Sequence, residues 1–142
     1  YFLAVLQSKL PYWLAFRGLK IVFRPRYHLM ILSQQHITAT PKDATRLSID
    51  EKTVFMSQLP GWQIISIDTI EQLYKSYTLK NFNAAMTFAN KISIIAEQCD
   101  HHPRLSVEWA KLSIYWWSHS IGGLHLNDLV MAAKTDEIYN TL

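Results

Sequence analysis

Residues 81–119 of this 142-residue chain read NFNAAMTFANKISIIAEQCDHHPRLSVEWAKLSIYWWSH. The first half predicts a helix over residues 82–99 with Asn81 as its N-cap, because apolar residues recur at steps of three and four. After a break at residues 100–103, the second half predicts a β-hairpin with strands at 105–109 and 112–119, turning at Ala110 and Lys111. The apolar positions of the helix are Phe82, Ala85, Met86, Ala89, Ile92 and Ala96.

The flanking sequence extends this pattern in both directions. Residues 62–67 and 72–79 predict a second hairpin, joined through Asp68 and Thr69. A helix capped by Ser48 precedes it and ends at Pro60, and a last helix is expected over residues 126–139. The order helix-strand-strand-helix-strand-strand-helix predicts an α+β domain: a four-stranded antiparallel sheet with three helices on one face. The expected inward residues are Val54, Phe55 and Leu59 in the first helix, Leu112, Ile114 and Trp116 in the last strand, and Leu126, Leu129, Val130 and Ala133 in the last helix.

Composition places the chain among compact globular domains. It is 49% hydrophobic and 18% charged, which excludes the disordered and collagen-like classes. The single cysteine, Cys99, excludes an internal disulfide and a multi-thiolate zinc site. No run of about 18 residues lacks charged or strongly polar groups, so a membrane-spanning helix is not expected.

The net charge of +3 is unevenly distributed. Residues 1–42 contain six basic and no acidic side chains, whereas residues 43–142 contain eight basic and eleven acidic ones, a balance of −3. We therefore interpret residues 1–42 as a basic N-terminal extension, with a loose lead-in at residues 37–44, and residues 43–142 as the domain. The charge of that domain does not favour direct nucleic-acid binding.

Residues 1–29 are aromatic and apolar without a clean period, and three interpretations of them stay open. They are a targeting presequence, an extension that packs on the domain, or sequence upstream of a start at Met30. A presequence would imply an organelle; otherwise we expect a cytoplasmic protein.

Three histidines carry the strongest chemical signal. His101 and His102 follow the best helix, and Pro103 restricts His102 to an extended conformation, so the two rings should point in opposite directions. His119 ends the last predicted strand. Imidazole gives or takes a proton near neutrality, which makes the three residues acid/base candidates. A solvated surface pair is the plain alternative, and a zinc site with Asp100 and Cys99 is a weaker one because the spacing fits no common zinc motif.

Glu97 is followed by His101-His102-Pro103 after a gap of three, by Trp109 after five, by His119 after nine and by Asp128 after eight. This spacing resembles the signature of the pterin-4a-carbinolamine dehydratases. The resemblance covers roughly residues 47–139 and implies the four-stranded, three-helix fold and a homodimer or homotetramer. It also implies loss of water from a 4a-hydroxytetrahydropterin to give the quinonoid dihydropterin, in tetrahydrobiopterin recycling, with no metal or organic cofactor.

The resemblance also implies roles for individual residues. His101 and His119 are expected to transfer protons and His102 to bind and orient the pterin, with Asp100 and Ser118 as further substrate contacts. Three residues are expected to support them: Glu97 by orienting His101, Trp109 as pocket wall or core, and Asp128 by catalysis or by compensating the dipole of the last helix. The chain departs from the family at His125, where a Ser or Thr cap is usual, and at Trp116 and Trp117, which are unusually bulky.

A binding module of the same fold is the rival function, since relatives also act as dimerisation partners of a transcription factor. Fold alone does not separate the two. The retained histidine trio favours the enzyme, because an interaction module would be free to lose it.

Overall fold

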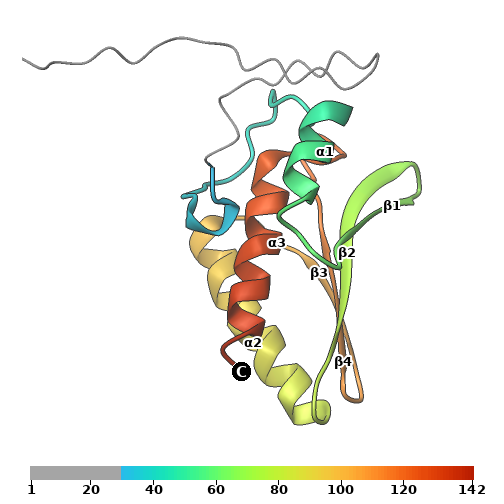
Figure 1. The fold of residues 1–142 in the computed structure, drawn as a ribbon, viewed down its shortest axis with the longest axis vertical. Helices are drawn as coiled ribbons and strands as arrows, with labels where there is room; N and C mark the ends of the chain where they lie inside the picture. The colour runs from blue at the N-terminus through green and yellow to red at the C-terminus, as the bar shows by residue number, and fades with distance from the viewer. Residues whose placement is uncertain (1–29) are drawn as a thin grey trace, which may run out of the picture.

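The computed structural model describes residues 30–142 and places three α-helices on one face of a four-stranded sheet (Figure 1). The predicted α+β class and element order are confirmed. The expectations for residues 1–29 lie outside the described residues. The elements are the 3-10 helix η1 (Leu32–Gln34), α1 (Ile49–Met56), β1 (Gln63–Ile67), β2 (Ile70–Thr78), α2 (Phe82–Cys99), β3 (Arg104–Glu108), β4 (Lys111–Trp116) and α3 (Leu126–Tyr139).

The sheet has the strand order β1-β2-β4-β3, and all neighbours are antiparallel. The first hairpin turns through Asp68 and Thr69 as predicted, and both adopt positive φ. The second turns through Trp109 and Ala110, so the turn predicted at Ala110 and Lys111 was wrong by one residue. The cause is the pairing of Lys111 with Glu108 across the hairpin, which also forms an ion pair of 2.7 Å.

The core lies between the sheet and the helices. Leu112, Ile114 and Trp116 share the inner face of β4 and are fully buried, as predicted. The helices complete this core with a larger set of apolar side chains: Phe55 from α1; Ala85, Phe88, Ala89, Ile92 and Ala96 from α2; and Leu129, Val130, Met131 and Ala132 from α3.

Three residues predicted on buried helix faces are partly exposed. Phe82 is 50% exposed, Met86 38% and Val54 37%. Phe82 is the first residue of α2, and the buried stripe of that helix runs through Phe88 and Ile92, which leaves Met86 at its margin.

The segment before α1 packs more closely than its composition indicated. Leu32 and Ile37 are buried in the core, and Lys134 of α3 donates a 2.8 Å hydrogen bond to the carbonyl of Ser33. Residues 37–44 contain no helix or strand, as the predicted lead-in implies, although Ile37 at their start is buried. Two apolar residues five positions apart give no period from which this packing could be predicted.

The helix starts follow their predicted caps. Ser48 and Glu51 form a capping box at α1, with the Glu51 carboxylate accepting from the Ser48 amide at 2.9 Å. Asn81 caps α2 by accepting from the amide of Ala84 at 2.8 Å.

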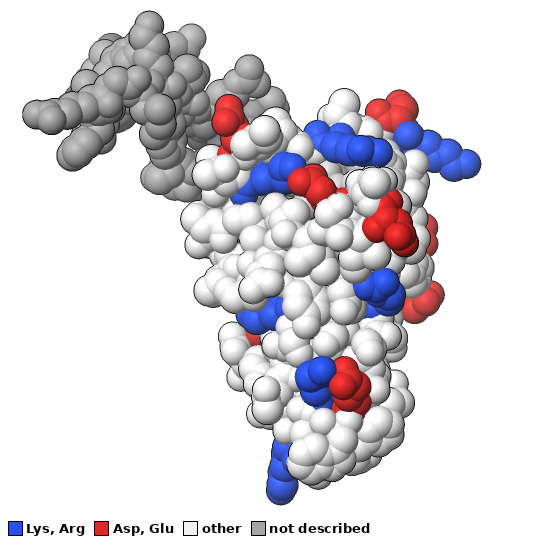
Figure 2. Space-filling model, turned by 90° about the vertical axis from the view of Figure 1, so that its right-hand side faces the viewer, with Lys and Arg blue, Asp and Glu red and all other residues white. Residues whose placement is uncertain are grey.

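The surface carries charges of both signs. On the side drawn in Figure 2, basic and acidic side chains are interspersed over a largely uncharged surface. Within residues 30–142, no helix combines the length and apolar character needed to cross a membrane.

Candidate active site

Strand pairing brings two of the predicted histidine segments to one end of the sheet. Arg104 opens β3 and pairs with Tyr115 near the end of β4, so residues 101–103 and 117–119 extend from the same end. Trp109 sits in the turn at the other end of this hairpin and is 77% exposed. A five-residue strand spans roughly 17 Å, so Trp109 does not join the histidines within one chain.

The C-terminus of α2 directs His101 into the protein. Asp100 adopts the left-handed conformation with φ 45°, and the amide of His101 donates back to the carbonyl of Ala96 at 3.0 Å. This six-to-one bond is the helix ending known as the Schellman motif, with an aspartate where glycine is usual. The chain reverses at Asp100, and His101 becomes 94% buried while Asp100 itself stays exposed.

The buried His101 ring is paired with Asp128. Its Nε2 lies 2.6 Å from Oδ1 of Asp128, a carboxylate with no exposed surface. The other carboxylate oxygen accepts from the Ser118 hydroxyl at 3.0 Å and from the His125 amide at 2.7 Å. Both of these donors bond Oδ2, so Oδ1 is left to accept from His101. An acceptor at Oδ1 favours the tautomer with a proton on Nε2, and Nδ1 then has no hydrogen-bond partner among the described residues.

Residues outside the predicted set support this buried pair. The Ser118 hydroxyl lies 3.1 Å from the hydroxyl of Thr40, which also accepts from the side-chain amide of Asn127 at 3.0 Å. Trp116 lies parallel to the His101 ring, with centroids 5.7 Å apart. Thr40 belongs to the segment predicted as a loose lead-in, so no sequence signal pointed to it. Ser118, predicted to contact substrate, is buried with its hydroxyl directed at Asp128.

His102 takes the opposite direction, as expected for adjacent residues in extended backbone. Its Nε2 lies 3.0 Å from Oε1 of Glu97, and both side chains are at least half exposed. The prediction that Glu97 orients His101 was wrong, because the reversal at Asp100 carries His101 to the other side of the helix end. Glu97 holds His102, and Asp128 holds His101.

His119 is the most loosely held of the three histidines. It lies in the turn between Ser118 and Gly123 and is exposed. Its ring stacks on Trp117 with centroids 4.2 Å apart and planes 14° apart. Among the residues that the structure describes, Trp117 is the one aromatic side chain that packs against the His119 ring.

His125 serves as the N-cap of α3, although a Ser or Thr is usual there. Its Nδ1 accepts from the amide of Asn127 at 3.2 Å, so the histidine ring caps the helix in place of a hydroxyl. Burial lowers the pKa of His125, which favours the neutral ring that this acceptor role needs.

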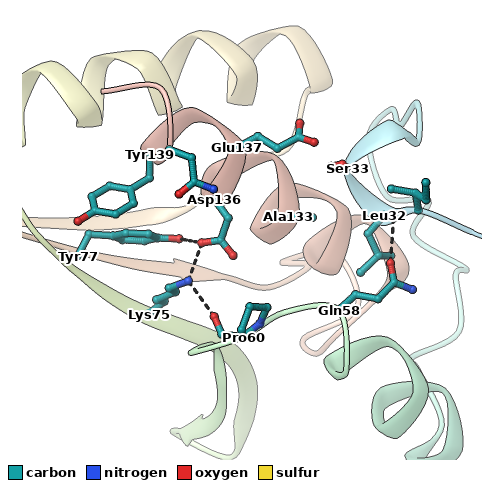
Figure 3. Close-up of a pocket in the computed structure, with 12 residues that line it drawn as sticks. Leu32, Ser33, Gln58, Pro60, Lys75, Tyr77, Ala133, Asp136, Glu137 and Tyr139 are labelled. Atoms are coloured by element: carbon teal, nitrogen blue, oxygen red, sulfur yellow. Dashed lines mark hydrogen bonds and ion pairs between the residues drawn. The ribbon is translucent and has the colours of Figure 1, made fainter.

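A cleft of about 400 Å³ lies elsewhere, between η1, β2 and the C-terminal half of α3 (Figure 3). One of its two carboxylates, Asp136, accepts from Lys75 at 2.7 Å, from Tyr77 at 2.5 Å and from Trp62 at 3.1 Å. Burial and then the hydrogen bond to Asp136 raise the pKa of the Tyr77 hydroxyl, so it stays protonated. Because these groups satisfy one another, we place the candidate active site at the histidines and not in this cleft.

The arrangement at the histidines is chemically suited to proton transfer. One imidazole is held against a buried carboxylate, and two more are exposed. Among residues 30–142, no three His, Cys, Asp or Glu side chains gather in a way that could hold a metal ion.

Comparison with known families decides the affiliation. Residues 45–138 match the model of the pterin 4 alpha carbinolamine dehydratase family. The chain belongs to this family. All eight predicted site residues, from Glu97 to Asp128, fall inside the matched region.

Individual relatives agree with the family. A Marinobacter nauticus protein, provisionally named a pterin-4-alpha-carbinolamine dehydratase, is 45% identical over 108 residues, which cover 76% of this chain and 97% of the relative. A Saccharophagus degradans protein with the same provisional name is 42% identical over 108 residues, covering 76% and 96%. The crystal structure of a Brucella melitensis protein, named transcriptional coactivator/pterin dehydratase, matches with a TM-score of 0.60 at 30% identity, covering 66% of this chain and 98% of that one.

Proposed function

We propose that this pterin carbinolamine dehydratase family member removes water from a 4a-hydroxytetrahydropterin by histidine acid/base catalysis, as a step in tetrahydrobiopterin recycling. The observation that carries the proposal is the buried pair of His101 and Asp128. A buried ionisable pair costs desolvation energy, and this one leaves a ring nitrogen free for proton exchange.

The reaction needs one proton delivered and one removed. The 4a-hydroxyl takes a proton and leaves as water when the C4a–O bond breaks, and loss of the N5 proton forms the C4a–N5 double bond. His101 suits the second step, because the Asp128 carboxylate stabilises the positive charge that forms on the ring when Nδ1 accepts the N5 proton. His119 suits the first, because its exposed ring rests on the Trp117 indole with a face open to a substrate at the surface.

Two of the remaining predicted residues, His102 and Asp100, fit binding roles. His102, exposed and steadied by Glu97, can orient the pterin, and Asp100 beside it can accept a hydrogen bond from the pterin's polar edge. Asp128 is a positioning residue in this scheme, since it is fully buried and acts through His101. The family resemblance further leads us to propose a homodimer or homotetramer in the cytoplasm.

The direct test is an assay of 4a-hydroxytetrahydropterin dehydration by the purified chain, followed against the spontaneous reaction. We expect clear acceleration, and removal of a general acid or base should lower it by about 10². Activity should persist after exhaustive chelation with EDTA, because the scheme uses no ion. Activity that EDTA abolishes and zinc restores would contradict the scheme.

The second candidate is a binding module without catalysis. The name of the Brucella melitensis protein, which includes transcriptional coactivator as well as pterin dehydratase, favours keeping it. A folded chain that fails to accelerate dehydration would support this candidate over the enzyme.

A further inference from the structure

Two consecutive tryptophans each lie parallel to one of the two histidines to which we assign proton transfer. Trp116 stacks on His101, with centroids 5.7 Å apart, and Trp117 stacks on His119, with centroids 4.2 Å apart. Successive residues of a strand point to opposite faces, so these two indoles serve different rings.

The two stacks differ in what else holds the histidine. His101 is already fixed by its 2.6 Å contact with Asp128 and by burial. His119 is exposed in a turn, and within the described residues its ring makes no hydrogen bond. An exposed histidine without a partner distributes over several rotamers, and the parallel indole selects the rotamers that keep the rings in contact.

Trp117 is itself held in place. It is half-buried and packs against the core, and the guanidinium of Arg104 lies 6.0 Å from its ring centroid. Arg104 is fixed in turn over Tyr115, at 3.8 Å from that ring. The indole is therefore a firm surface, and it is the surface on which the exposed His119 ring rests.

We propose that Trp117 is a positioning residue that fixes the His119 ring for proton transfer, an inference that rests on the proposed function. It touches the histidine and not the reacting atoms. Losing it should therefore lower kcat while substrate binding, and so KM, changes little. An aromatic replacement should keep much of the effect, because the stacked face is retained.

The test compares Trp117→Val with Trp117→Phe in the full chain, with Tyr74→Val as a matched control. Tyr74 is an aromatic residue of β2 that packs at a tilt against Tyr115 of β4, with centroids 4.9 Å and planes 36° apart. We expect W117V to lower kcat about tenfold with KM within about threefold, and W117F and Y74V to keep kcat within about threefold. Thermal midpoints of all three variants establish that they are folded under assay conditions.

Proton NMR of the His119 ring supplies a second readout that does not depend on turnover. The indole ring current should shift the His119 ring protons upfield in the wild type, and W117V should remove this shift while Y74V keeps it. Unchanged kcat in W117V, or equal losses in W117V and W117F, would overturn the inference. A wild-type chain without dehydratase activity would overturn the proposed function, and with it the role of Trp117.

Discussion

His101 and His119 lie in neighbouring parts of the fold but in opposite physical settings. His101 is buried, ion-paired to Asp128 and covered by Trp116. His119 is exposed in a turn and rests on one indole. Under the proposed function, this contrast predicts different losses: removing His101 should harm both the fold and the chemistry, whereas removing His119 should harm the chemistry alone.

His101→Ala should have the largest effect. It leaves the Asp128 carboxylate buried without its ring partner, and removal of one member of a buried pair costs about 3 kcal/mol or more. We expect a lower free energy of unfolding in urea and a fall in dehydration rate of about 10² or more. A variant as stable and as active as the wild type would contradict both roles assigned to His101.

His119→Ala should lower the rate by about 10² while leaving stability almost unchanged. The side chain is exposed and buries little apolar surface, so its loss removes a reactive group and one ring stack. The thermal midpoint should stay within a few degrees of the wild type. Full activity in H119A would remove the residue from the mechanism, and a large stability loss would show that the exposed turn is structural.

Glu97→Gln should act weakly and on substrate binding. The carboxylate is 78% exposed and pairs with the exposed His102, and such surface pairs contribute little to stability. We expect KM to rise a few fold with kcat nearly constant, and the effect to shrink at high salt. A fall in kcat as large as that of H101A would mean that Glu97 acts through His101 after all.

His125→Ser should change the pH dependence of stability by a small amount. Burial lowers the folded-state pKa of His125 below its usual 6.5, so the unfolded chain binds more protons and stability falls as the pH drops below about 6.5. Serine keeps the helix cap without a titrating ring. The thermal midpoint of H125S should therefore decline less than that of the wild type between pH 7 and pH 5, and parallel curves would refute this contribution.

Local patterns were sufficient to predict most of the fold. The 82–99 helix and both hairpins follow from short-range periodicity and turn residues, and all of these elements are present in the folded structure. Periodicity did not predict the burial of every residue, because burial also depends on long-range packing. Met86 has helical spacing but lies at the margin of the buried stripe, while Leu32 and Ile37 are buried without any period.

The sequence named the residues of the candidate site, but it predicted less well which of them contact one another. Asp128 and His101 are 27 positions apart, so their contact depends on how α3 crosses the end of α2, which no local pattern specifies. Glu97 was matched to the wrong histidine because helical spacing was extended past Asp100, whose left-handed backbone ends the helix. The supporting hydroxyl of Thr40 lies 78 positions from Ser118 and had no signal at all.

The central claim is that Asp128 serves the dehydration reaction by holding His101. Asp128→Asn tests it most directly, with Asp136→Asn as the control, because both are carboxylates of α3 that accept at least three hydrogen bonds and only Asp128 contacts a histidine ring. The measurement is kcat per folded molecule for 4a-hydroxytetrahydropterin dehydration, with both variants assayed below their unfolding transitions. We predict a loss of about 10² for D128N and a value near the wild type for D136N. Equal kcat in the two variants would contradict the claim.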